Sequence, residues 1–225
     1  MDALLNWATF DARAIPSSLR VPPELCAISR PGARIVDLGC GIGNLCLELA
    51  SSAGVEVSGI DVNSQAIEIA AARAELLGLP AMFGCADVGR GTGLEPNHFS
   101  VSVMQAFLSV LRDRAERAAA LREAYRILQP RGLLFFHDFA QAWHHPLYRK
   151  RYLSGLREFA EAGTFRVNLE SPAPVEYVAH HFSEREIVAL LSRERFRIVR
   201  FKYTRVQTQS GNRIYGFIII ARKMP

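Results

Sequence analysis

The chain has 225 residues and lacks several features that would place it outside the ordinary globular proteins. Its four cysteines show no Cys-x-x-Cys pair and no metal-ligand spacing, which excludes a disulfide-stapled fold and indicates reduced thiols in a cytoplasmic protein without a metal site. The longest apolar run, Phe217 to Ala221, is far too short to span a bilayer. No signal peptide is predicted, because no basic and apolar segments open the chain. Without repeats or linkers, residues 1–225 are expected to form a single domain.

Lysine is also scarce, with 3 residues against 24 arginines, and the net charge of +5 is unevenly distributed. Residues 1–110 carry 6 basic and 11 acidic side chains, whereas residues 111–225 carry 21 basic and 11 acidic ones. A basic half can attract an anionic substrate or a nucleic acid. The plainer interpretation is a solvated surface of arginine and glutamate, and both interpretations stay open at this point.

Strand-like apolar runs alternate with segments of helical period through residue 139. The runs are residues 33–38, 55–60, 80–85, 99–104 and 133–139, and the helical segments are 44–53, 64–77 and 113–128. In the second helical segment the expected buried face consists of Ile67, Ala70, Ala74 and Leu77. Such regular alternation is typical of an α/β fold whose mostly parallel sheet is covered by helices on both faces.

The pattern changes after residue 139. A basic helix is expected over 146–163, a hairpin over 164–182, and a helix from a capping box at Ser183 to about Arg195. Strands over 196–204 and 213–222 are expected to pair as an antiparallel C-terminal hairpin. Residues 140–182 are therefore predicted to be a cap inserted between the fifth strand and the last helix, above the carboxyl edge of the sheet.

A glycine-rich loop follows the first strand, with Gly39, Gly41 and Gly43 ahead of a helix. Glycines there let a ligand approach the backbone, and the helix N-terminus offers unpaired N–H groups. The dinucleotide fingerprint fails in both registers, because Asn44 or Cys46 stands where its third glycine belongs. The carboxylate of Asp37 would also repel a pyrophosphate. The loop therefore favours a nucleotide-like ligand that has no phosphates and carries a cation.

The segment from Ile35 to Gly43 resembles the first motif of the class I S-adenosylmethionine-dependent methyltransferases. Three further segments are similar to that family in the same order, namely 59–61, 85–88 and 128–132, the last with Arg131 where the family has a glycine. The resemblance covers residues 33–139 closely and 183–222 more loosely. It implies a Rossmann-like sheet of seven strands, an N-terminal helical lid over residues 1–30, and S-adenosylmethionine as the cofactor.

The resemblance also assigns residues to that cofactor. Asp61 would hold the ribose, Asp87 would accept from the adenine amino group, and Gln105 would face the sulfonium end. The full set is Asp37, Gly39, Cys40, Gly41, Asp61, Val62, Asp87, Val88 and Gln105. Trp7 and Phe10 are candidates to close over the cofactor or to pack against the sheet.

The acceptor side offers fewer signals. His137 and Asp138 end the fifth strand; because side chains alternate, only one is expected to face the site, and Asp138 is preferred as a catalytic residue. Two histidine doublets, His144-His145 and His180-His181, are interpreted as a polar lid, and His181 or its neighbour His180 is a candidate base. Tyr177 is a candidate to contact the sulfonium by cation–π attraction.

The leading hypothesis is a methyltransferase acting on a small molecule. No Asn/Asp-Pro-Pro-Tyr/Phe tetrapeptide follows the fourth strand, which argues against methylation of base amines or glutamine amides, and no RNA-binding module is recognisable. The alternative is attack on the aminopropyl side of the cofactor, by transfer or cyclisation, with release of methylthioadenosine. An RNA methyltransferase, a silent cofactor-binding subunit and a homodimer stay open.

Overall fold

The computed structural model describes residues 7–12, 21–52, 54–170, 174–208 and 211–225. Nine strands and their helices follow one another along this part of the chain. In order they are η1 (Trp7–Thr9), α1 (Pro23–Cys26), β1 (Arg34–Leu38), α2 (Asn44–Ala50), β2 (Glu56–Asp61), α3 (Ser64–Leu77), β3 (Ala81–Cys85), β4 (Phe99–Gln105), η3 (Leu108–Val110), α4 (Arg114–Ile127), β5 (Leu128–Phe139), α5 (Pro146–Phe159), β6 (Thr164–Glu170), β7 (Pro174–His180), α6 (Glu184–Arg193), β8 (Phe196–Gln207) and β9 (Arg213–Lys223).

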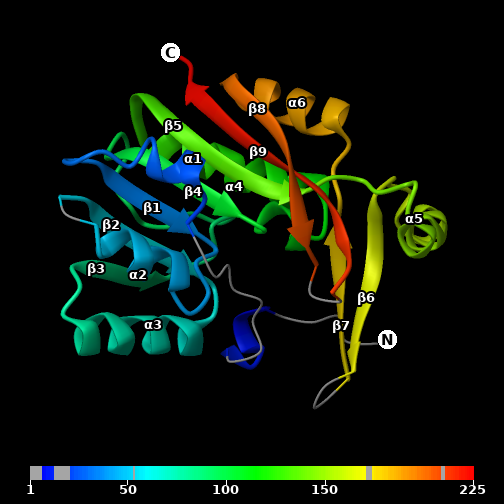
Figure 1. The fold of residues 1–225 in the computed structure, drawn as a ribbon, viewed down its shortest axis with the longest axis horizontal. Coiled ribbons are helices and arrows are strands. Elements are labelled where there is room, and N and C mark those ends of the chain that lie inside the picture. The colour runs from blue at the N-terminus through cyan, green and yellow to red at the C-terminus, as the bar shows by residue number, and fades with distance from the viewer. Residues whose placement is uncertain (1–6, 13–20, 53, 171–173, 209–210) are drawn as a thin grey trace.

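Seven of the strands form one sheet in the order β3-β2-β1-β4-β5-β9-β8. Neighbours from β3 to β5 are parallel, whereas β9 runs antiparallel to both β5 and β8. This confirms the predicted Rossmann-like sheet with its antiparallel C-terminal hairpin (Figure 1). The order reverses direction between β1 and β4, and ligands of open α/β sheets bind beside such a reversal.

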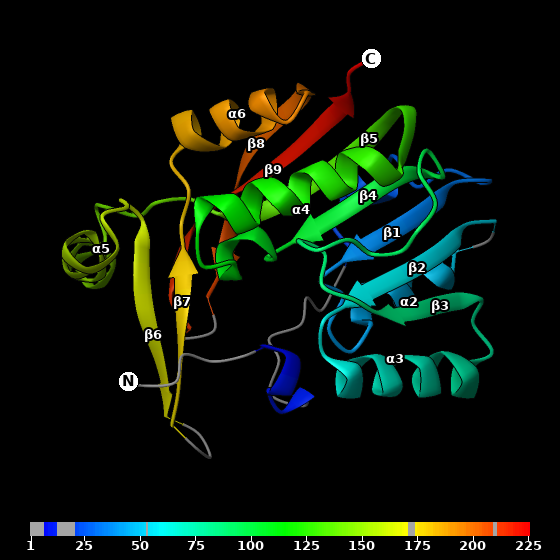
Figure 2. The ribbon, with the colours of Figure 1, turned by 180° about the vertical axis from the view of Figure 1, so that it is seen from behind.

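Two apolar clusters fill the two sides of the sheet. One joins α4 and α6 to the strands through residues such as Leu121 and Ile187, and the other joins α1 and α2 through residues such as Leu25 and Leu49. The helices accordingly appear on opposite faces of the sheet in the two views (Figures 1 and 2). None of the helices in the described ranges is long and apolar enough to cross a membrane.

Local patterns misplaced some boundaries and faces. The buried stripe of α3 is Ala66, Ala70 and Ala74, so its four-residue spacing continues to Gly78 and leaves Leu77 59% exposed, against the prediction. The helix expected over 113–128 is confirmed as α4 with its caps Asp113 and Leu128, whereas α5 ends at Phe159, short of the predicted residue 163.

Half of the predicted capping box at α6 forms. The Ser183 hydroxyl accepts from the Glu186 backbone N–H at 3.2 Å. The Glu186 carboxylate does not turn back to the cap, however, because it lies 2.9 Å from Nε2 of His180. The helix start is thus tied to the preceding strand β7.

The predicted cap is present as α5 and a separate two-stranded sheet of β6 and β7. α5 packs on β6, and the hairpin extends away from the main sheet (Figure 2). A third apolar cluster holds the cap together, with Tyr148, Tyr152, Phe165 and Tyr177 among its members. Ile214 of β9 belongs to the same cluster, so the cap is continuous with the C-terminal hairpin.

Candidate active site

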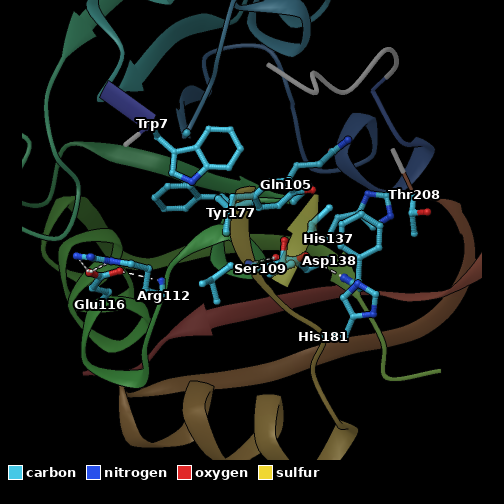
Figure 3. A pocket seen from close by; sticks show the side chains of 18 of the residues that line it. Trp7, Gln105, Ser109, Arg112, Glu116, His137, Asp138, Tyr177, His181 and Thr208 are labelled. Atoms are coloured by element: carbon cyan, nitrogen blue, oxygen red, sulfur yellow. Dashed lines mark hydrogen bonds and ion pairs between the residues drawn. The ribbon is translucent and has the colours of Figure 1, made fainter. Parts of the chain in front are cut away.

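A cavity of about 1170 Å³ extends from the glycine loop to the cap. Its walls come from distant parts of the chain, with Trp7 of η1, Asp61 after β2, Asp138 of β5, Tyr177 of β7 and Thr208 after β8 among them. Figure 3 shows Gln105 and His137 near the middle of the cavity, between the Arg112–Glu116 pair at one end and His181 and Thr208 at the other. Pockets that hold drug-sized ligands measure roughly 300–1000 Å³, so this one has room for more than one small molecule.

The glycine loop forms one end of this cavity. Gly39 has φ +81°, and a Cβ there would lie 2.3 Å from the Phe107 ring, so a side chain at this position would be both strained and obstructed. The Asp61 carboxylate fixes the loop, because it accepts from the N–H of Gly41 at 2.8 Å and from that of Asn63 at 3.0 Å. Burial raises the pKa of Asp61. Each of its oxygens keeps a second lone pair for a ligand hydroxyl.

Three residues assigned to the cofactor by resemblance do not line the cavity. They are Asp37, Cys40 and Gly41, whereas Gly39, Asp61, Val62, Asp87, Val88 and Gln105 do line it. Asp37 is buried at the end of β1, where burial and then the charge of Asp61 raise its pKa to about 7. The Cys46 thiol lies 3.8 Å from its carboxylate. Asp37 is therefore buried beneath the glycine loop, next to α2, and is not part of the cavity wall.

A second carboxylate, that of Asp87, lines the cavity just after β3. Asp87 accepts from the N–H of Gly89 at 2.9 Å and pairs with Arg90 at 3.4 Å, and the adjacent Val88 is buried. The resemblance assigns this pair of residues to the adenine ring. Both residues line the cavity, and the N–H of the preceding Ala86 donates to the Asp61 backbone oxygen at 2.9 Å, which is compatible with that assignment.

Unpartnered polar atoms lie in the middle of the cavity. Gln105 and His137 face each other across the β4–β5 pair, and in the described part of the chain neither Oε1 of Gln105 nor either ring nitrogen of His137 has a hydrogen-bond partner. Burial lowers the pKa of His137 to about 4, so its ring is neutral at pH 7. Buried polar atoms are nearly always hydrogen-bonded in folded proteins, so these are sites where a ligand is expected.

Asp138 also reaches the cavity, which corrects the expectation that only one residue of this pair would face it. Its carboxylate accepts from the N–H of Ser109 at 3.0 Å and from that of Phe139 at 2.9 Å, and it thereby holds η3 against the end of β5. Burial raises its pKa to about 7. The alternation of side chains along β5 does not predict which residue faces the cavity here, because η3 folds against the end of the strand.

The cap contributes the remaining predicted residues. Tyr177 lines the cavity with its ring 5.4 Å from that of Trp7, and burial raises its pKa to about 12. His181 lies 2.7 Å from the Tyr152 hydroxyl through Nδ1 and stacks on Phe139. Burial, then the charges of neighbouring residues, lower its pKa to about 3. The polar-lid interpretation is wrong for this doublet, since both histidines are inside the cap.

His180 belongs to a network behind the cavity. Its Nδ1 lies 2.7 Å from the Thr164 hydroxyl, and with Glu161 and Glu186 it forms the one group of three possible metal ligands in the described chain. Glu161 is already paired with the buried Arg117 at 2.5 Å. The positive charge beside Glu161 thus comes from an arginine rather than from a metal ion. Because Arg117 belongs to α4, this ion pair joins the cap to that helix.

Comparison with known proteins gives the same architecture a family context. Residues 35–132 match the model of a family described as a methyltransferase domain. The crystal structure of a SAM-dependent methyltransferase from Methanosarcina mazei superposes with a TM-score of 0.85 and 38% sequence identity, covering 92% of this chain and 99% of that one.

Two curated relatives are similar over shorter stretches. An arsenite methyltransferase from Aquipseudomonas alcaligenes is 32% identical over 159 residues, which are 60% of this chain and 45% of that protein. A ubiquinone biosynthesis O-methyltransferase from Neisseria meningitidis is 30% identical over 106 residues, 47% of this chain and 43% of that protein. The chain therefore spans less than half the length of the curated relatives that it matches.

Proposed function

The chain belongs to the S-adenosylmethionine-dependent methyltransferases, and on that premise we propose that it methylates a small molecule bound between the glycine loop and the cap. The observation that carries the proposal is the cavity of about 1170 Å³. It has Asp61 and Asp87, which the resemblance assigns to the cofactor, and polar atoms for which the described residues provide no partner. A cavity of this volume accommodates the cofactor together with a small acceptor.

The residues present fit S-adenosylmethionine. Gly39 leaves a backbone surface that a Cβ would fill, and Gln105 presents a buried oxygen that has no partner among the described residues. Asp61 would bind the ribose hydroxyls, and Asp87 with Val88 would bind adenine. When bound, the cofactor supplies an electrophilic methyl group on a sulfonium. The chain itself needs only to align the acceptor and exclude water, which can contribute roughly 7–11 kcal/mol to the barrier reduction.

His137 is the proposed general base for acceptors that must lose a proton. Its ring is neutral at pH 7 and both nitrogens are without partners in the described chain, so one of them can accept the acceptor's proton. Asp138 is then a positioning residue, since its carboxylate is buried and accepts from the Ser109 N–H, which holds η3 against the end of β5. Tyr177 and His181 would form the acceptor's walls.

The cavity argues for an organic acceptor rather than arsenite. Trivalent arsenic binds thiolates, yet none of the four cysteines lines the cavity. Cys26 and Cys85 are exposed elsewhere, and Cys40 and Cys46 are buried. The cavity of this chain therefore has no thiolates to bind the substrate named for the arsenite relative.

The test is to incubate the protein with S-adenosylmethionine and quantify S-adenosylhomocysteine and methylthioadenosine, first alone and then with pools of metabolites and of tRNA. We expect S-adenosylhomocysteine to appear only with a metabolite pool, and to be lost in Asp61→Ala. Enzyme-dependent methylthioadenosine would instead establish aminopropyl chemistry. Methylation confined to tRNA would overturn the small-molecule proposal.

A further inference from the structure

The cavity is lined by four arginines, and only two of them have a carboxylate partner in the described chain. Arg90 pairs with Asp87, and Arg112 pairs with Glu116 at 3.0 Å. The other two are Arg151 of α5 and Arg205 of β8, for which the described residues provide no ion pair. Both unpaired guanidinium groups belong to the cap and the C-terminal hairpin, away from the glycine loop.

Arg151 is half-buried among aromatic rings. Its guanidinium carbon lies 5.5 Å from the centre of the Tyr148 ring and 5.6 Å from that of Phe165, and both rings line the cavity. Its positive charge also acts on Tyr177 and His181, which lie on the cavity wall. Burial raises the pKa of Tyr177 to about 12, so its phenol is un-ionised at pH 7, and no anion within this group balances the arginine. The rings orient the guanidinium and leave its N–H donors available.

We propose that Arg151 binds an acidic group of the acceptor, and that the acceptor is a planar aromatic or similarly flat molecule carrying a carboxylate. The flat body would pack against the rings of Tyr148, Phe165 and Tyr177, which line the cavity, and the carboxylate would receive paired N–H donors from the guanidinium. This inference rests on the proposed function, because it names the acceptor class for the same cavity.

Arg205 supports the assignment from the rim. Its guanidinium carbon lies 4.4 Å from the centre of the Tyr215 ring, on the exposed strand β8. A positive charge at the mouth of a cavity attracts anions, and its effect falls with ionic strength. The net charge of +10 carried by residues 111–225, from 21 basic and 11 acidic side chains, acts in the same direction.

The experiment is isothermal titration of the protein saturated with S-adenosylhomocysteine, using benzoate against benzamide and naphthoate against naphthamide. Acid and amide have nearly the same shape and differ in charge. We expect at least one acid to bind saturably and about tenfold or more tighter than its amide, as a charge-assisted hydrogen bond predicts. Arg151→Gln should abolish this preference, and Arg151→Lys should restore part of it.

Arg157→Gln is the matched control, because it removes the same charge from an exposed position on the same helix, outside the cavity. It should keep the preference for the acid. The proposal is overturned if neither acid outcompetes its amide, or if Arg151→Gln retains the preference. Binding of S-adenosylhomocysteine is titrated first in every variant, since its absence in the wild type would refute the proposed function rather than the acceptor class.

Discussion

Replacing Glu161 by glutamine should destabilise the whole protein, although the residue lies outside the cavity. Its carboxylate is 2.5 Å from Arg117, 2.7 Å from Arg114 and 2.7 Å from the Thr164 hydroxyl. Arg117 is fully buried, so the neutral amide would leave that guanidinium without a counter-ion. Breaking one partner of a buried ion pair typically costs about 3–5 kcal/mol.

The pH dependence gives a second measure of the same interaction. Burial alone would raise the pKa of Glu161, but the hydrogen bonds from Arg117, Thr164 and Arg114 outweigh it and lower the pKa from 4.5 to about 2. Because the folded pKa lies below the unfolded one, the stabilisation is complete above pH 4.5 and is lost as the pH falls towards 2. The shift corresponds to about 3 kcal/mol at pH 7, in agreement with the first argument.

Urea unfolding of wild type and Glu161→Gln is the assay, at pH 7 and at pH 4. We expect the difference in the free energy of unfolding to be about 3 kcal/mol at pH 7 and to narrow by about 1 kcal/mol at pH 4. Glu158→Gln is the control, because its pair with Arg166 is exposed and should contribute less than about 1 kcal/mol. Equal small losses in both variants would refute the reasoning, as would a difference that widens in acid.

Three further predictions concern the cap, the cofactor and the base. Gly155→Ala should lower the unfolding free energy by up to about 2 kcal/mol although alanine has the better helix propensity, because its Cβ would lie 1.8 Å from a β6 carbonyl oxygen. Ser154→Ala is the control, and an increase in stability of Gly155→Ala would contradict the close packing of α5 on β6. Asp61→Asn should weaken S-adenosylhomocysteine binding about tenfold by calorimetry with little change in melting temperature, since charge-assisted acceptors are the stronger ones; unchanged affinity would remove Asp61 from the cofactor site. With His137 as base, kcat/KM should be constant above about pH 5 and fall in acid as the ring is protonated. A limb near pH 7 that Asp138→Asn abolishes would assign the base to Asp138 instead.

The parts of the fold that the sequence predicts are those set by neighbours along the chain. The strands β1 to β5, the glycine loop and the C-terminal hairpin follow from apolar runs, glycine positions and turn residues. Asp61 and Gly39 meet in the same cavity because parallel strands end at the same edge. Errors occur where a tertiary contact overrides the local signal, as at Glu186, whose carboxylate binds His180 rather than its own helix cap.

The acceptor side was less predictable because its residues are brought together by the cap. Alternation along β5 could not decide between His137 and Asp138, since both line the cavity and η3 is hydrogen-bonded to the Asp138 carboxylate. Arg151 appeared only as one charge in a basic helix. Its proposed role depends on two tertiary features: the Phe165 ring of β6 lies beside its guanidinium, and no carboxylate among the described residues pairs with it. Neither feature has a local sequence signal.

The two ends of the cavity are built from different parts of the fold. The proposed cofactor end is built from the carboxyl ends of β1, β2 and β3, which pair with one another in the main sheet. The acceptor end is assembled from η1, the cap and the C-terminal hairpin, which share a separate apolar cluster. Substitutions at Phe165 or Tyr177 can therefore change the shape of the acceptor wall without moving Asp61. Such variants should alter the KM for the acceptor while the affinity for S-adenosylhomocysteine stays constant, and a parallel loss of both would mean that the two ends fold as one unit.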